Sequence, residues 1–195
     1  MLKAVVALLV AGVCSAAERP VLLRAAERAI ALIQKSQESW FHQQQCSSCH
    51  HQFLPAIAFR EARDRGIYVD ETKAHADAAK AFAQYADIDR AVQYTHQIDA
   101  AMDDAYRLLA AEAAGVRPSL VTAIYARHIA VRQQADGHWA TIDARPPQSS
   151  SFITATAVSV RAIDPYHHAT LEADTRDRVA RARQWLAGQR PACTE

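Results

Sequence analysis

The stretch Ile129-Ala130-Val131-Arg132-Gln133-Gln134-Ala135-Asp136-Gly137-His138-Trp139 repeats a pattern that first occurs about 100 residues earlier, at Ile30-Ala31-Leu32-Ile33-Gln34-Lys35-Ser36-Gln37-Glu38-Ser39-Trp40. When the two tryptophans are aligned, Phe53 falls on Phe152, and the isoleucine, alanine and first glutamine of the two stretches also coincide. An apolar helical pattern precedes each tryptophan, and another follows each phenylalanine. The repeat therefore predicts a stack of helical hairpins.

The composition favours one helical, globular domain. Of the 195 residues, 50% are hydrophobic and 22% are charged, and the formal net charge is +1. This balance argues against a disordered tail, which has too little apolar surface to bury, and against a nucleic-acid-binding surface, which needs clustered Lys and Arg. The 5 Gly and 7 Pro are too few turn residues for many short strands, and the stretches between them are rich in helix-favouring residues.

Capping and breaking residues predict where the helices begin and end. Pro20 suits a first helical turn, and Gly66 and Gly115 suit helix ends. Asp70 suits an N-cap, and any of the three serines Ser149, Ser150 and Ser151 can cap the helix that begins at Phe152. We expect helices over about residues 20–37, 54–65, 71–85, 91–114, 118–134, 152–163 and 171–187. No segment shows the alternation of a strand, so the expected fold class is all-α.

Residues 1–17 have the features of a secretory signal peptide. Lys3 supplies a positive charge, residues 4–13 are apolar, and small residues end the segment. The apolar run is shorter than the roughly 20 residues that span a bilayer, so we expect cleavage and no stable membrane span. The bulky residue in Val13-Cys14 makes a lipoprotein the less favoured alternative. The expected mature domain is 18–195, periplasmic or secreted.

Two of the cysteines that remain after cleavage lie in Cys46-Ser47-Ser48-Cys49-His50, which is the C-x-x-C-H pattern of c-type haem attachment. Cys46 and Cys49 have the spacing that forms thioether bonds to the two vinyl groups of one haem. His50 then supplies an axial nitrogen to the iron. Export strengthens this interpretation, because c-type haem is attached outside the cytoplasm. We therefore predict covalent haem c at Cys46, Cys49 and His50.

Two alternatives to haem stay open at this motif. One is a redox-active or structural disulfide between Cys46 and Cys49. The other is a zinc site in which both cysteines act together with two of His42, His50 and His51.

Met102 and His96 are the candidates for a second axial ligand of the iron. Met102 is the only methionine besides the first residue, so a His/Met pair is one alternative, although methionine also suits a helix interior. His51 is too close in sequence to His50 to reach the opposite face of the same haem. An open sixth position that binds a small ligand is a further alternative.

The segment Gln134-Ala135-Asp136-Gly137-His138-Trp139 reads Q-x-x-G-x-W and resembles the QW repeat of squalene–hopene cyclases and related prenyltransferase-like proteins. The resemblance, which includes residues 152–157, implies an α/α toroid built from concentric helix pairs. Residues 46–52 resemble a haem-motif insertion of some exported bacterial relatives, in the connection between an outer and an inner helix. Three tryptophans are then expected to pack between helix pairs: Trp40, Trp139 and Trp185.

The chain departs from that family in two respects. Terpene cyclases that protonate their substrate share a D-x-D-D acid cluster, whereas here Ala101 stands in the first position before Asp103-Asp104. We therefore expect Asp103 and Asp104 to be solvated on a helix surface. The helices suffice for only a partial ring, and the chain stops soon after a third copy of the repeat begins at Trp185, so we expect a fragment of a longer protein.

Three functional interpretations remain from the sequence. The first is an exported c-type haem protein in electron transfer or redox sensing, which needs a redox partner protein and no nucleic acid. The second is a terpenoid-cyclase-like enzyme with a structural C-x-x-C, and the missing acid cluster counts against it. The third is a helical interaction scaffold with a disulfide or metal clip. An absorption spectrum separates the first from the other two.

Overall fold

The structure is a computed structural model that describes residues 2–44, 47–93, 99–142 and 151–191. Side chains are described from residue 19 onward, except those of Cys49, Ala100 and Met102. Within these ranges the chain is helical and contains no β-strand, which confirms the predicted all-α class. In the same ranges, no helix combines the length and the apolar character needed to cross a membrane.

Short turns of π or 3-10 geometry, labelled η, lie between some of the helices. In chain order the described elements are α1 (Leu2–Gln44), η1 (Cys49–Phe53), α2 (Leu54–Asp64), α3 (Glu71–Ala81), η2 (Ala83–Ala86), α4 (Ile88–Val92), η3 (Ala100–Asp104), α5 (Ala105–Ala113), α6 (Leu120–Ala130), α7 (Phe152–Ile163), η4 (Ala169–Leu171) and α8 (Glu172–Ala187).

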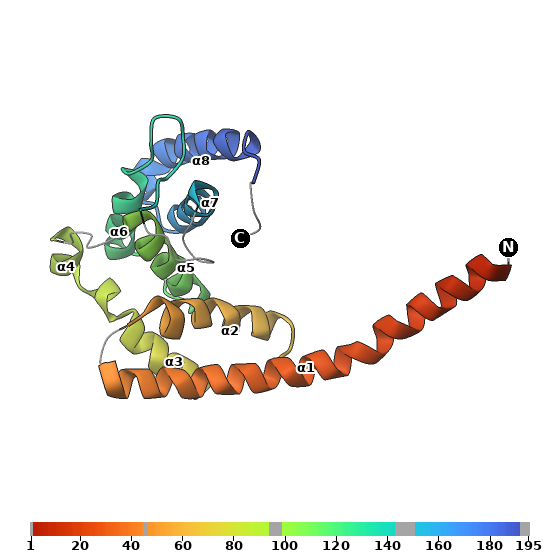
Figure 1. Ribbon diagram of the computed structural model, residues 1–195. Coiled ribbons are helices and arrows are strands. Elements are labelled where there is room, and N and C mark those ends of the chain that lie inside the picture. Colours follow the sequence, from red (N-terminus) through yellow and green to blue (C-terminus); the bar gives the residue numbers. More distant parts are fainter. Residues whose placement is uncertain (1, 45–46, 94–98, 143–150, 192–195) are drawn as a thin grey trace.

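The helices pack in a row that starts at α1. The N-terminal half of α1 projects away from the other helices, and its C-terminal half lies beside α3 and η1 (Figure 1). η1 leads directly into α2. α5 packs against α2 and against α7, and α7 in turn packs against α6 and α8. The succession α2, α5, α7 therefore connects the two copies of the repeat.

The predicted capping residues take their expected roles. Asp70 accepts a hydrogen bond from the Lys73 N–H at 3.1 Å at the start of α3, and Ser151 caps α7. Gly66 follows α2 with φ +69°, and Gly115 follows α5 with φ +82°, a left-handed conformation that glycine adopts without strain. These local signals correctly predicted where several helices begin and end.

The N-terminal helix is longer than predicted. α1 begins at Leu2 and continues through Pro20 to Gln44, whereas the sequence predicted a start at Pro20 and an end near Gln37. A proline inside a helix removes one backbone hydrogen bond, but the Ala- and Leu-rich stretches on both sides favour helix and continue it. That residues 1–17 form a cleaved signal peptide stays a prediction.

The single helix predicted over residues 91–114 is wrong. α4 ends early, and the turn η3 precedes α5, which starts only at Ala105. The Asp103 carboxylate accepts a hydrogen bond from the Asp99 N–H at 3.4 Å, while the Asp99 carboxylate accepts hydrogen bonds from residues 141–142. Aspartate side chains compete with helical backbone bonds. The tertiary contact of Asp99 therefore favours a turn over a continuous helix.

The turn after α6 depends on a glycine of the Q-x-x-G-x-W segment. α6 ends at Ala130, earlier than the predicted residue 134, and the chain turns at Gly137, where φ is +104°. A Cβ at this position would lie 2.6 Å from the carbonyl oxygen of Arg181 in α8. Glycine allows both the backbone conformation and the close approach. Trp139, which follows the turn, is fully buried as predicted and donates its Nε1–H to the Ile129 carbonyl at 2.8 Å.

The aligned glutamines of the two repeat copies make corresponding connections. The Gln34 amide donates to the Asp70 carbonyl at 2.9 Å and accepts from the Asp70 N–H at 3.1 Å. The Gln133 amide donates to the Arg178 carbonyl at 2.8 Å. Gln34 thereby joins α1 to the start of α3, and Gln133 joins the chain just after α6 to α8.

Two hydrophobic clusters hold the helices together. The larger joins α2, α5, α6 and α7, and its large members include Phe53, Leu108, Tyr125, Ile129 and Ile163. The smaller joins α1, α2 and α3 through Ile30, Phe59, Ala62, Val69 and Ala74. The aligned phenylalanines differ, because Phe53 is 1% exposed whereas Phe152 is 45% exposed.

Candidate functional site

The predicted haem-attachment motif lies between α1 and α2. Cys49 begins η1, and its side chain is outside the described part of the structure; Cys46 lies outside it entirely. His50 is exposed on η1. Of the two predicted second ligands, Met102 belongs to η3 but its side chain is not described, and His96 lies outside the described residues.

Ser48 and Gln52 build the turn that carries Cys49 and His50. The Ser48 hydroxyl accepts a hydrogen bond from the His51 N–H at 3.1 Å, and the Gln52 side-chain carbonyl accepts one from the Ser48 N–H at 2.7 Å. The Gln52 N–H also donates to the Ser48 carbonyl at 3.0 Å. This reciprocal arrangement satisfies backbone groups at the start of a helical segment. Because Gln52 is fully buried, the turn is fixed to the body of the protein.

The two adjacent histidines of the motif have different surroundings. The His51 ring stacks on Trp40 of α1, with 4.2 Å between ring centroids and 15° between planes, and its Nδ1 lies 3.2 Å from the Ser48 hydroxyl. Burial, and to a smaller extent the neighbouring His50, lower the pKa of His51. His51 therefore packs η1 against α1, while the His50 side chain stays exposed to solvent.

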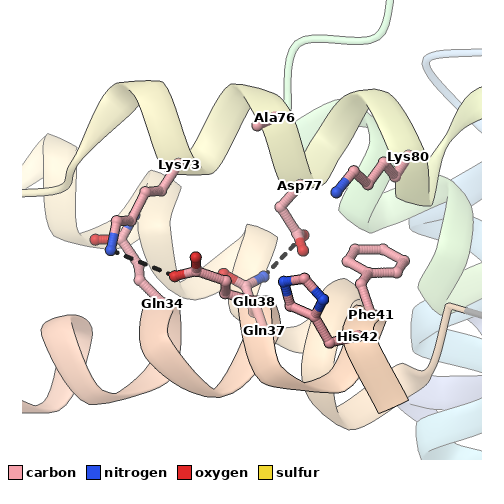
Figure 2. Close-up of a pocket in the computed structure, with 9 residues that line it drawn as sticks. All are labelled: Gln34, Gln37, Glu38, Phe41, His42, Lys73, Ala76, Asp77 and Lys80. Carbon is pink, nitrogen blue, oxygen red and sulfur yellow. Dashed lines mark hydrogen bonds and ion pairs between the residues drawn. The ribbon is translucent and has the colours of Figure 1, made fainter. Parts of the chain in front are cut away.

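A cleft of about 250 Å³ lies between α1 and α3 (Figure 2). The turn η1 contacts both of these helices. The walls of the cleft combine amides, an aromatic ring and charged groups: Gln34, Gln37, Glu38, Phe41, His42, Lys73, Ala76, Asp77 and Lys80. The Lys80 ammonium lies 5.3 Å from the centre of the Phe41 ring, and the Lys73 ammonium lies 3.6 Å from the Glu38 carboxylate. The cleft thus has an apolar part next to cationic groups.

The motif and the cleft share residues of α3. The Ser47 hydroxyl donates to the Ala81 carbonyl at 3.4 Å, next to Lys80 in the cleft wall. Asp77 accepts a hydrogen bond from the Gln37 amide at 2.9 Å. Burial raises the pKa of Asp77 to about 6, and the Gln52 amide and Lys80 oppose this rise. The turn that carries the motif therefore contacts the end of α3 at Ala81, next to the cleft residue Lys80, and lies close to Asp77 through Gln52.

The residues present suit one edge of a haem. Ligand pockets typically occupy about 300–1,000 Å³, so the cleft of about 250 Å³ is too small for a whole macrocycle. The Phe41 ring suits an apolar porphyrin edge, and lysine ammonium groups suit propionate carboxylates. For a zinc site, His51 is the least suited of the three histidines considered, because its ring already packs on Trp40 and contacts Ser48.

The expectation that Asp103 and Asp104 are solvated is wrong. Asp104 is 2% exposed and Asp103 is half-buried, because η3 packs against α5, α6 and α7 instead of lying on an exposed helix. Burial is the main cause that raises the pKa of Asp103. Asp99, which is also buried, accepts hydrogen bonds from Thr141 and from the Ile142 N–H. The sequence reasoning missed this acidic cluster because it assumed one continuous helix.

His138 of the Q-x-x-G-x-W segment has a packing role. Its ring stacks between Phe152 and Trp185, with centroid distances of 5.0 Å and 5.1 Å. Its Nδ1 lies 2.6 Å from the Asp136 carboxylate, which lowers the pKa of that aspartate. The predicted packing role of Trp185 is consistent with this stack, which joins α8 to the start of α7.

Comparison with protein-family models, with curated proteins and with solved structures found no match to this chain.

Proposed function

We propose that this chain is an exported c-type haem protein that transfers electrons or senses redox state. Cys46 and Cys49 would hold the haem, and His50 would be its first axial ligand. The contrast between the two adjacent histidines supports this proposal most strongly: His51 packs on Trp40, whereas His50 is exposed. An available imidazole directly after the second cysteine is what haem attachment through C-x-x-C-H requires.

We also propose that the helices form part of an α/α toroid. The succession of packed helices α2, α5 and α7 and the corresponding connections made by Gln34 and Gln133 support a repeated helical hairpin. The repeat aligns the haem motif with residues 145–150, which lie outside the described residues. The family resemblance of the Q-x-x-G-x-W segment is a second support for this arrangement.

Attachment would require both cysteines as thiols. Each S–H adds across one vinyl C=C bond, so that sulfur bonds to one carbon and the proton moves to the other. The chain then gains the mass of one whole haem, and the step needs no oxidant. When bound, the haem iron would exchange single electrons. A disulfide between Cys46 and Cys49 would prevent attachment.

The cleft residues of α1 and α3 would hold one edge of the porphyrin. Phe41 would contact the apolar ring, and Lys80, whose ammonium already lies over Phe41, would pair with a propionate. Lys73 is paired with Glu38 and would contribute less charge.

The proposal also includes export to the periplasm or the medium, and a redox partner protein that exchanges electrons with the haem.

Expression of the full chain in a periplasm that contains the c-type maturation machinery tests this function. We expect an intact mass equal to the processed polypeptide plus one haem, and colour that survives acid–acetone extraction. The double variant Cys46→Ser/Cys49→Ser should be colourless, whereas Cys193→Ser, the matched control, should keep its haem. A wild-type chain without added mass, whether colourless or loaded with zinc, would overturn the proposal.

A further inference from the structure

We propose that the solvent-facing side of α1 binds the surface of a bilayer that contains anionic phospholipids. The segment concerned is residues 21–35, in which exposed cations lie beside exposed apolar side chains on one side of the helix. This inference goes beyond the proposed function and does not depend on haem.

Three cations form a line along α1, which we call the cationic strip. They are Arg24, Arg28 and Lys35, and all three are exposed. The second and third follow the first by four and eleven residues, which places the three side chains within about 40° around the helix axis. None of them forms an ion pair with a residue that the structure describes. Their charge is therefore available to an anionic partner outside the chain.

An apolar strip runs beside the cationic strip. Its members are Val21, Ala25 and Leu32, each of which precedes one of the cations by three residues. The two strips therefore have the same spacing and are about 60° apart around the helix. Val21 is 56% exposed and Leu32 is 68% exposed. Exposed apolar side chains beside Arg and Lys are typical of helices that lie in the interface of a bilayer.

Both strips lie on the side of α1 that faces away from the protein body. Ile30, Gln34 and Gln37 are buried, and their spacing places them on the other side of the helix from the apolar strip. Ile30 belongs to the cluster that joins α1 to α2 and α3, and Figure 1 shows these two helices on one side of α1. A flat surface can therefore approach residues 21–35 along their whole length.

Glu27 and Glu38, the acidic side chains that the structure describes on α1, are directed toward α3. Glu27 lines a gap together with Tyr68 and Lys73, and the Glu38 carboxylate lies 3.6 Å from the Lys73 ammonium. The charge on the side of α1 that faces away from the body is thus positive. This charge favours an anionic surface over a neutral one.

A bilayer explains the two strips together, whereas an acidic protein partner explains only the cations. The cleft and the gap beside α1 lie on its α3 side, so the opposite face is the convex surface of a single helix. A deformable headgroup layer accommodates such a surface. Val21 and Leu32 would enter the acyl boundary, while the long side chains of the cationic strip would reach the lipid phosphates.

Binding of the full chain to lipid vesicles tests this inference. Vesicles of phosphatidylglycerol and phosphatidylcholine in equal parts are compared with vesicles of phosphatidylcholine alone, and sedimentation measures the bound fraction. We expect the chain to bind the acidic vesicles about tenfold more tightly or better at low salt. The preference should decrease as the salt concentration rises, because salt screens the attraction.

The triple variant Arg24→Gln/Arg28→Gln/Lys35→Gln should bind the acidic vesicles about 100-fold more weakly, because each cation at an anionic surface contributes about fivefold. The matched control Arg117→Gln/Arg161→Gln/Arg183→Gln removes three exposed cations from other parts of the chain. It should stay within about twofold of the wild type, because charges held away from the bilayer are screened.

The variant Val21→Ser/Leu32→Ser tests the apolar strip separately. It should weaken binding to the acidic vesicles by about tenfold or more, because less apolar surface enters the bilayer. Both side chains are exposed in the free protein, so the melting temperature should change little. Binding equal to that of the wild type would contradict the role of the apolar strip.

Three further results would overturn the inference. The first is equal binding of the wild type to the two kinds of vesicle, which would indicate the apolar residues 4–13 instead. The second is no binding to the acidic vesicles, even if an acidic protein still binds α1. The third is an equal loss for both triple variants, which would indicate an effect of net charge. A colourless chain that binds the acidic vesicles would contradict the proposed function alone, and a haem-loaded chain that does not bind them would contradict this inference alone.

Discussion

Asp77 is a residue whose environment disfavours its charged form. Burial raises its pKa to about 6 in the folded chain, and the Gln52 amide and Lys80 offset only part of this effect. The folded state therefore binds the proton more tightly than the unfolded state. Its contribution to stability is present at pH values below the ordinary pKa of an aspartate and is lost as the pH rises through about 6.

Asp77→Asn should remove this pH dependence. The amide is always neutral and keeps an oxygen that accepts the hydrogen bond from Gln37. We expect the variant to equal the wild type near pH 3 and to be more stable by about 1 kcal/mol at pH 7. Urea unfolding across this range measures the difference. Asp64→Asn, at the exposed end of α2, is the control, and an Asp77→Asn curve parallel to the wild type would contradict the prediction.

Gly137→Ala should destabilise the fold strongly. The residue has φ +104°, and an added Cβ would lie 2.6 Å from the Arg181 carbonyl oxygen. Backbone strain and steric clash together predict a loss of about 2 kcal/mol or more in the free energy of unfolding. Gly66→Ala is the matched control: its φ is +69° but no atom lies within 4 Å of the new Cβ, so strain alone should cost about 1 kcal/mol. Equal losses for the two variants would show that the contact with α8 is unimportant.

At the scale of the elements, the stability of the turn η1 depends on the Ser48 hydroxyl. Ser48→Ala removes the acceptor of the His51 N–H and the contact with the His51 ring, and should destabilise the chain by about 1 kcal/mol. Ser47→Ala, whose hydroxyl makes a single long bond to the Ala81 carbonyl at 3.4 Å, should cost less. Thermal unfolding followed by circular dichroism compares the two. A larger drop in melting temperature for Ser47→Ala than for Ser48→Ala would contradict the role of the Ser48 hydroxyl in stabilising η1.

Local sequence signals predicted those helix ends that local groups determine. Asp70, Gly66 and Ser151 marked boundaries correctly because their effects act within one turn. The break before α5 was missed because it depends on contacts of Asp99 with residues 141–142, which are distant in sequence.

The same distinction applies to the site. The sequence could predict the residues proposed for haem attachment, since the C-x-x-C-H pattern is contiguous. It could not indicate that α3 lies beside α1 and forms the cleft with His42 and Lys80, because that packing joins residues far apart in the chain. The stack of Trp40 on His51, which distinguishes His51 from His50, is also tertiary.

At the scale of the whole molecule, α5 couples the two halves of the chain. It packs against both α2 and α7, and its Leu108 is fully buried. Leu108→Ala should lower the free energy of unfolding by about 3 kcal/mol, and the loss should affect both halves together. Far-UV circular dichroism and tryptophan emission should therefore shift to the same lower urea midpoint. Leu120→Ala, at a side chain that is 57% exposed, should change stability by less than about 0.5 kcal/mol.

Two separate transitions in the Leu108→Ala variant would contradict this coupling. They would show that the α1–α3 region and the α6–α8 region unfold independently, with α5 as a connection that contributes little to cooperativity.

The contact between Trp40 and His51 has a practical consequence for testing the proposed haem attachment. It places an indole directly against η1, the turn proposed to carry the haem, whereas Trp139 and Trp185 belong to the second copy of the repeat and to α8. A porphyrin bound at that turn would accept excitation energy from this nearby indole most efficiently. The loss of Trp40 emission would therefore be an intrinsic optical test of whether a porphyrin has bound at this turn, without an attached dye.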